Sequence, residues 1–263
     1  MLDLTVAEIR EQLRKADAKA FEVLERSLVA DARKGVRSAV EVARRRLEAE
    51  SAERERLSRL YSFEAEIAAE RNANAVIGLD EVGRGPLAGP LAVGAVVLDG
   101  DSVIEGLNDS KQVKPEDRVL IAEQVKQLAR AWTVRYIEPA DIDAHGMTSS
   151  LKSAFRQAIS DIEQQGVAVD LVLLDGNPLH IDDREVNVVK GDGRCASIAA
   201  ASIIAKVERE ALMVTLDGLY PGYGFAANKG YASPEHIEAI ERLGLSPVHR
   251  ASFCTSFTQP TLF

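Results

Sequence analysis

The sequence predicts an α/β fold preceded by an all-helical N-terminal extension. The first 74 residues hold one of the 18 glycines and none of the 9 prolines, which favours long helices. After residue 75, apolar runs typical of strands alternate with helical patterns, and glycine and proline stand at the joints. We therefore expect a helical extension over residues 1–74, an α/β domain over 75–254 and a tail over 255–263.

Helical periodicity in the extension predicts three helices, over residues 4–16, 18–32 and 36–70. Thr5 and Glu8 have the spacing of a capping box, and Gly35 is expected to break the chain between the second and third helices. The extension is electrically neutral, with 15 basic and 15 acidic residues. Its arginine run Arg44–Arg46 is either a solvated helix face or a contact for nucleic acid.

The α/β domain shows five strand patterns, over residues 75–80, 91–98, 131–137, 170–175 and 186–190. The run over 91–98 contains no polar residue, so both faces of that strand should be buried. Four helices are expected between and after the strands, over residues 115–130, 147–165, 194–217 and 234–243.

Composition narrows the class of protein. No segment approaches the roughly 18 apolar residues of a membrane span, and the first residues do not resemble a secretory signal, so we expect a cytoplasmic protein with no membrane partner. Cys195 and Cys254 are too few for a disulfide framework or a structural zinc site, so any bound metal needs oxygen ligands. The net charge of -9 argues against non-specific binding of nucleic acid.

Carboxylates stand at the ends of three predicted strands. Asp80 and Glu81 close an apolar run and lead into a turn rich in glycine and proline, while Asp175 and Asp192 end two later runs. These acids either face water or need a cation, because a buried unpaired charge is costly. With no histidine or cysteine among them, the set suits Mg²⁺ or Mn²⁺. Two ions about 4 Å apart could activate water and stabilise the leaving oxygen of a phosphodiester.

The stretch Val76–Phe253 resembles the bacterial ribonuclease HII family. Seven sequence elements occur in the order found in that family: Gly78–Pro90, Asn108–Lys111, Leu174–Asn177, Lys190–Asp192, Ser197–Lys206, Tyr220–His236 and His249–Phe253. The resemblance implies a ribonuclease H-like mixed sheet flanked by helices. It also implies that the catalytic metal ligands are Asp80, Glu81, Asp175 and Asp192, which would bind Mn²⁺ or Mg²⁺, two ions during turnover.

The implied activity is that of an endoribonuclease. Members of the family hydrolyse the RNA strand of RNA/DNA hybrids and incise duplex DNA on the 5′ side of a single embedded ribonucleotide, leaving a 3′-hydroxyl. The resemblance assigns reading of the ribose 2′-hydroxyl to the backbone of Gly83, Arg84 and Gly85, since glycine permits a close approach to a sugar. Tyr231 is expected to stack on the neighbouring deoxyribose, with a packing role as the alternative.

Basic residues beside these motifs are expected to form a local rim that binds nucleic acid despite the net charge: Lys111, Lys190, Lys206, Lys229 and Arg250. Lys111 and Lys206 are candidate phosphate contacts, with structural salt bridges as the alternative. His236 and His249 are expected to be structural or to lie at the edge of the substrate rather than to act as general bases.

Two rival functions are weighed against this one. The sister enzyme ribonuclease HIII normally has lysine where Arg84 stands and carries a sheet-containing N-terminal domain, so Arg84 and Tyr231 favour ribonuclease HII. A module that binds hybrids without cutting them would not need all four carboxylates. We expect a monomeric enzyme.

The C-terminal tail suggests a protein partner. Gln259, Leu262 and Phe263 have the spacing of the short peptide that bacterial replication proteins insert into the sliding clamp. The alternative is a frayed chain end that packs on its own domain.

Overall fold

The computed structural model describes residues 4–100 and 102–258 and divides into two compact units, Met1–Ser58 and Arg59–Phe263. The long helix α3 (Lys34–Glu70) contributes to both of them. This division lies earlier in the chain than the boundary expected after residue 74. The last turns of α3 therefore belong to the unit that holds the sheet.

The first unit is all-helical, as predicted. Helices α1 (Val6–Lys15) and α2 (Ala18–Leu28) pack with the start of α3 around an apolar core formed by Ile9, Leu13, Ala16, Phe21, Leu28, Val36, Ala39 and Ala43. The capping box of Thr5 and Glu8 is confirmed. Gly35 does not break the chain between helices but lies in the first turn of α3. A Cβ there would lie 2.8 Å from Val6 Cγ1, so glycine permits close packing with α1.

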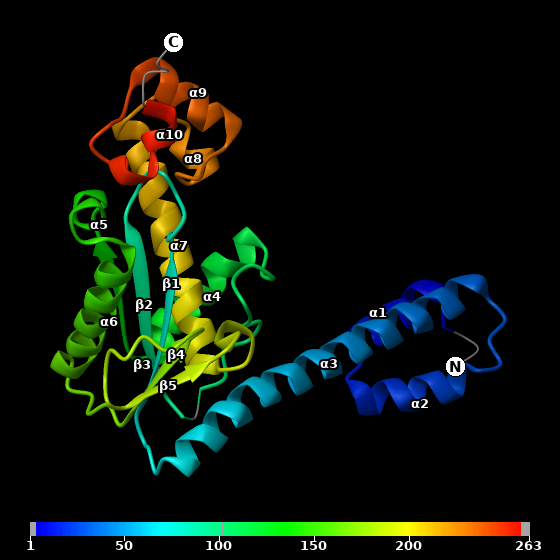
Figure 1. Ribbon diagram of the computed structural model, residues 1–263. Helices are drawn as coiled ribbons and strands as arrows, with labels where there is room; N and C mark the ends of the chain where they lie inside the picture. The colour runs from blue at the N-terminus through cyan, green and yellow to red at the C-terminus, as the bar shows by residue number, and fades with distance from the viewer. Residues whose placement is uncertain (1–3, 101, 259–263) are drawn as a thin grey trace. The chain divides into compact units, whose positions relative to one another are not determined.

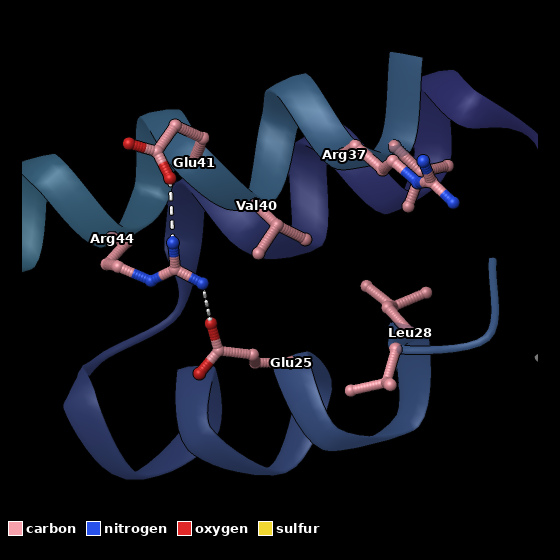
Figure 2. Close-up of a pocket in the computed structure, with 8 residues that line it drawn as sticks. Glu25, Leu28, Arg37, Val40, Glu41 and Arg44 are labelled. Atoms are coloured by element: carbon pink, nitrogen blue, oxygen red, sulfur yellow. Dashed lines mark hydrogen bonds and ion pairs between the residues drawn. The ribbon is translucent and has the colours of Figure 1, made fainter. Parts of the chain in front are cut away.

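A groove between α2 and α3 shows what the arginine run does in the first unit. Arg44 lies at this groove and pairs with both Glu25 and Glu41 (Figure 2). Arg46 pairs with Glu50 and donates to the carbonyl of Ala16 at 2.6 Å. Arg44 and Arg46 are thus engaged in ion pairs and in helix packing, while Arg45 is largely exposed and pairs with Glu41, as on an ordinary charged helix.

The second unit contains a mixed five-stranded sheet of order β3-β2-β1-β4-β5. Its strands are β1 (Val76–Val82), β2 (Leu91–Leu98), β3 (Ala129–Ile137), β4 (Leu171–Asp175) and β5 (Glu185–Val188). Strands β1, β2 and β3 pair antiparallel, whereas β1, β4 and β5 pair parallel. All five predicted strands are confirmed, and residues 91–97 are fully buried as expected. Strand β1 runs two residues beyond its predicted end because Glu81 and Val82 still pair with β2.

Helices cover the sheet on both sides (Figure 1). The four predicted helices are α4 (Pro115–Leu128), α6 (Met147–Gln164), α7 (Ala196–Leu219) and α9 (Pro234–Leu243). The short elements α5 (Pro139–His145), η1 (Gly191–Gly193), α8 (Phe225–Asn228), η2 (Ala251–Phe253) and α10 (Thr255–Thr258) were not predicted. They are too short to show a helical period. No helix in the described ranges is long and apolar enough to span a membrane.

Strand alternation places α6 and α7 on opposite faces of the sheet. Ile77 and Leu79 share a buried cluster with the α6 residues Ala154, Phe155 and Ile159. Gly78, between them, faces α7, because a Cβ on Gly78 would lie 2.2 Å from the carbonyl carbon of Ser197. The absence of a side chain lets the start of α7 lie directly on β1, two residues before Asp80.

Candidate active site

The parallel pairing of β1 and β4 brings the predicted carboxylates to one edge of the sheet. Leu79 pairs with Leu174, so the next residues, Asp80 and Asp175, are neighbours on adjacent strands. Asp175 pairs in turn with Val188 at the end of β5, and the chain then enters η1, which contains Asp192.

Backbone and basic groups orient these carboxylates. The Glu81 N–H donates to Asp80 Oδ1 at 2.7 Å, and the Gly191 N–H donates to Asp175 Oδ1 at 2.6 Å. Arg84 pairs with Glu81 at 3.2 Å, and Lys111 Nζ lies 3.4 Å from Asp192 Oδ2. Within residues 4–100 and 102–258, no ion pair engages Asp80 or Asp175.

The carboxylates sit in an electrostatically unfavourable place. Burial raises the pKa of Asp80 well above its ordinary value, and the charges of Glu81 and Asp175 raise it further. Burial also raises the pKa of Glu81, and the pKa of Asp192 rises through burial and the nearby charges of Asp109 and Asp175. A bound cation would relieve both the mutual repulsion and the burial of charge.

The donor set fits a divalent cation in chemistry and in charge. Carboxylate oxygens are the ligands that Mg²⁺ and Mn²⁺ prefer. In the described part of the chain, no group of three or more His, Cys, Asp or Glu side chains already has the arrangement of a metal centre. Two of the four carboxylates have basic partners instead: Glu81 pairs with Arg84, and Asp192 with Lys111. Cation binding would require these two side chains to exchange partners.

The predicted substrate loop follows the carboxylates directly. Gly83 has φ +91°, and a Cβ there would lie 2.3 Å from Arg209 Nε, so only glycine fits. Arg84 and Gly85 are exposed, and a Cβ on Gly85 would meet no atom within 4 Å. The loop is therefore fixed at its first residue and open to a ligand at the next two.

Tyr231 lies near this loop. The N–H groups of Leu87 and Ala88 both donate to the Gly230 carbonyl, which ties the turn after Gly85 to the residue before Tyr231. Tyr231 is 43% exposed, so it is available to a ligand.

Known proteins match this chain along most of its length. The family model "Ribonuclease HII" matches residues 77–256, and "Ribonuclease HII N-terminal domain" matches residues 5–68. A ribonuclease HII of Listeria monocytogenes is 38% identical over 249 residues, which cover 95% of this chain and 94% of the relative. The chain belongs to the ribonuclease HII family.

Two further relatives support this membership. A ribonuclease HII of Ruminiclostridium cellulolyticum is 42% identical over 208 residues, which cover 79% of this chain and 80% of the relative. The ribonuclease HII of Archaeoglobus fulgidus, solved in a complex with PCNA, has a TM-score of 0.61 and 26% identity. That match covers 72% of this chain and 98% of the other. The predicted ribonuclease H-like mixed sheet is confirmed.

Family membership confirms the predicted class of reaction. The chain is a metal-dependent endonuclease that cleaves RNA in RNA/DNA hybrids and at ribonucleotides embedded in DNA. The N-terminal family model also covers the three helices of the extension, which matches the all-helical first unit.

The ribonuclease HII fold does not bring all the expected basic residues to a surface rim. Arg250 is completely buried, so its assignment to that rim was wrong. The physical reason is that its guanidinium donates only to main-chain carbonyls inside the domain. Lys206 pairs with Glu210 at 2.9 Å, which is the salt-bridge alternative. Lys111 remains largely exposed beside Asp192.

Of the two roles expected for the histidines, structural or at the edge of the substrate, their burial favours the structural one. His236 and His249 are buried against each other, with their Nε2 atoms 3.1 Å apart.

Sequence reasoning missed Glu64, which caps a helix of the ribonuclease HII core. Cys195 precedes α7 without a side-chain cap, and Glu64 of α3 supplies one instead. Glu64 Oε2 accepts from the Ser197 N–H at 2.7 Å and from Ser197 Oγ at 2.8 Å. The neighbouring Phe63 ring lies 4.2 Å from the guanidinium of Arg194. The end of α3 thus holds the segment that joins Asp192 to α7.

Proposed function

We propose that the ribonuclease activity of this chain is carried by Asp80, Glu81, Asp175 and Asp192, which bind Mg²⁺ or Mn²⁺ at the sheet edge. The observation that supports the proposal best is the parallel register of β1 and β4. It sets Asp80 beside Asp175, although both are acidic and neither has an ion-pair partner in the described ranges. Such a cost in electrostatic energy is typical of sites that bind a cation.

The carboxylates would hold two cations, which when bound supply Lewis acidity toward a phosphate oxygen and lower the pKa of water. The residues of the chain perform the positioning. The Glu81 and Gly191 N–H groups fix one oxygen each of Asp80 and Asp175, and Ser202 also forms a hydrogen bond with the Asp80 carboxylate. Lys111 is placed beside Asp192 to contact a substrate phosphate.

We further propose that the enzyme incises on the 5′ side of a single ribonucleotide in duplex DNA. The backbone of Gly83, Arg84 and Gly85 would read the 2′-hydroxyl, because Arg84 and Gly85 are exposed and follow a buried glycine that no other residue can replace. The ring of the exposed Tyr231 would stack on the adjacent deoxyribose. The two contacts together would recognise a ribonucleotide followed by a deoxyribonucleotide.

An incision assay on duplex DNA with one ribonucleotide tests this function. We expect cleavage with Mg²⁺ or Mn²⁺ and none with a chelator. Asp175→Asn should lower the rate on the order of 10³-fold, because it removes one ligand charge while it keeps the shape of the side chain. The variant should still bind the duplex. Asp183→Asn, on an exposed loop residue, is the matched control and should keep the full rate. An active Asp175→Asn enzyme would remove Asp175 from the ligand set.

We also propose that the C-terminal tail binds the sliding clamp. Gln259, Leu262 and Phe263 lie outside the described residues, so the proposal depends on their sequence. An archaeal relative has been solved in a complex with PCNA, which supports a clamp as the class of partner. We expect a dissociation constant in the micromolar range, which corresponds to a binding free energy of about -8 kcal/mol. A titration of the clamp with the full chain and with a chain that ends at Thr258 tests it; equal affinities would contradict the proposal.

A further inference from the structure

The buried side chain of Arg250 holds the backbone of the substrate loop, Gly83–Gly85, from inside the domain. This side chain is completely buried, yet no acidic side chain in the described ranges forms an ion pair with it. Nη2 donates to the carbonyls of Gly83 at 2.7 Å and Gly89 at 2.8 Å, Nη1 to that of Arg84 at 3.0 Å, and Nε to that of Gly89 at 3.1 Å. The planar guanidinium therefore fixes both ends of the turn that contains Gly85.

These bonds also set the direction of two peptide N–H groups. In a trans peptide, the C=O of one residue and the N–H of the next point in opposite directions. Because the carbonyls of Gly83 and Arg84 point inward to Arg250, the N–H groups of Arg84 and Gly85 point away from it. Both residues are exposed, and the described residues offer neither N–H an acceptor. Arg250 thus presents two donors for a ligand.

His249, the residue before Arg250, is connected to Tyr231. The Ser246 N–H donates to His249 Nδ1 at 2.9 Å, so that nitrogen is an acceptor. His249 Nε2 then carries the proton and donates to His236 Nε2 at 3.1 Å. His236 Nδ1 therefore carries a proton as well, and donates to the Tyr231 carbonyl at 2.8 Å. The network assigns one neutral tautomer to each ring.

The connection from Arg250 to the Gly83–Gly85 loop and the connection from His249 to Tyr231 both start in the segment 249–250. Residue 249 forms an isolated bridge with Ala88, and the Arg250 N–H donates to the Leu87 carbonyl at 2.7 Å. The segment is thus anchored on the turn that follows the substrate loop. Any displacement of residues 249–250 would change the distance between the Gly83–Gly85 backbone and Tyr231.

We propose that His249 and Arg250 are positioning residues that set the spacing between the Gly83–Gly85 loop and Tyr231, and thereby the preference for a lone ribonucleotide over a continuous RNA strand. This rests on the proposed reading of the 2′-hydroxyl and the neighbouring sugar by those two parts. A lone ribonucleotide offers a single register in which both contacts form. In a continuous RNA strand the neighbouring sugar is a ribose, so the contact between Tyr231 and a deoxyribose is not made and cleavage depends less on the spacing.

The test compares two substrates with one set of variants. Arg250→Lys keeps the charge but cannot make the forked bonds, and His249→Asn interrupts the connection to Tyr231. We measure kcat/KM on duplex DNA with one ribonucleotide and on a continuous RNA/DNA hybrid. The ratio of the two values should fall roughly 10- to 100-fold in each variant, since a displacement of about 1 Å has effects of that size. Arg242→Lys, on the exposed face of α9, should leave the ratio unchanged.

Three outcomes separate the possibilities. An equal loss on both substrates, with the ratio kept, would overturn the inference and leave His249 and Arg250 a purely structural role. If Arg250→Lys does not fold, as judged by circular dichroism, the ratio measured for His249→Asn decides. If the unmodified enzyme does not incise at a lone ribonucleotide, the proposed function fails first, which is a different result from an unchanged ratio in the variants.

Discussion

Two regions are adjacent in the chain but opposite in their electrostatics. One is the carboxylate edge of the sheet, which carries Asp80, Glu81 and Asp175, and the other is the turn Gly83–Pro90 that follows it. At the edge, burial raises the pKa of Asp80 and of Glu81, and the nearby charge of Asp175 raises both further. In the turn, the buried side chains of Arg209 and Arg250 donate to main-chain carbonyls on every side. The carboxylates at the edge repel one another. Burial also lowers the pKa of both guanidiniums in the turn, but their N–H groups are satisfied by several main-chain carbonyls.

This difference shows how stability and function are divided between the two regions. A group of unpaired carboxylates destabilises the fold but can bind a cation strongly, because binding removes the repulsion. Carbonyls that already accept from a buried arginine are not available to a ligand, so these parts of the turn contribute a fixed shape instead. Substitutions at the two regions should therefore change the free energy of unfolding in opposite directions.

Arg209→Met should give the largest change in stability. Arg209 donates to the carbonyls of Pro90, Lys229 and Ala88 at 2.9, 3.0 and 3.2 Å. Methionine keeps part of the apolar stem but leaves these buried carbonyls without a donor, which should cost on the order of 3 kcal/mol. Urea unfolding measures the loss, with the exposed Arg242→Met as control. A loss below about 1 kcal/mol would mean that the arginine is not what satisfies the turn.

The histidine pair behind Tyr231 should make stability depend on pH. Burial, and then the charge of His236, lower the pKa of His249 from 6.5 to about 4. Its contribution is therefore complete above pH 6.5 and is lost as the pH falls toward 4, because only the unfolded chain binds a proton in that range. We expect a loss of roughly 2 kcal/mol after solvent screening.

Unfolding experiments across this pH range isolate the effect by comparing the parent chain with His249→Asn. The difference in unfolding free energy between the two should shrink as the pH falls. His145→Asn, at an exposed position, should reproduce the parent's pH dependence. Parallel curves for the parent and His249→Asn would show that the ring is protonated equally in the folded and unfolded states.

The carboxylate edge could be predicted from the sequence, and the arginine-held turn could not. Strand patterns are local, so the positions of Asp80 and Asp175 at strand ends were visible, and the parallel pairing of their strands then brought them together. In the sequence, Arg250 cannot be told apart from other basic residues, because the carbonyls that it binds, those of Gly83 and Gly89, lie more than 160 residues earlier. Carbonyl acceptors also have no signature in the sequence, since every residue carries one.

Glu64 shows the same limit in a helix. On a long helix with many charged residues, its carboxylate looks like any solvated acid. Its partner, Ser197, is 133 residues away, and the missing signal is the lack of a capping side chain at Cys195. The absence of a capping side chain at the start of this helix is a signal that could have shown that another element must supply a cap.

Asp80→Asn should stabilise the fold while it removes activity. The amide keeps an oxygen that can accept from the Glu81 N–H but carries no charge next to Glu81 and Asp175. We expect the free energy of unfolding in a chelator to rise by about 1–2 kcal/mol, the reverse of the Arg209→Met result. Asp183→Asn is the control. A less stable Asp80→Asn protein would mean that the buried carboxylate is favourable without a cation. It would contradict the opposite changes in stability expected for the carboxylate edge and the turn.

Glu64→Ala should have the smallest effect on stability and tests how the edge is held together. Loss of the cap on α7 should cost about 1 kcal/mol, and Glu64→Gln should cost less because its amide oxygen can still accept from Ser197. Burial raises the pKa of Glu64, so a neutral side chain there carries little penalty. Since α7 begins just after Asp192, the alanine variant should also need a higher Mg²⁺ concentration for half-maximal rate, while the exposed Glu66→Ala control should not. A loss of stability with an unchanged Mg²⁺ requirement would confine Glu64 to helix capping and separate it from the metal-binding edge.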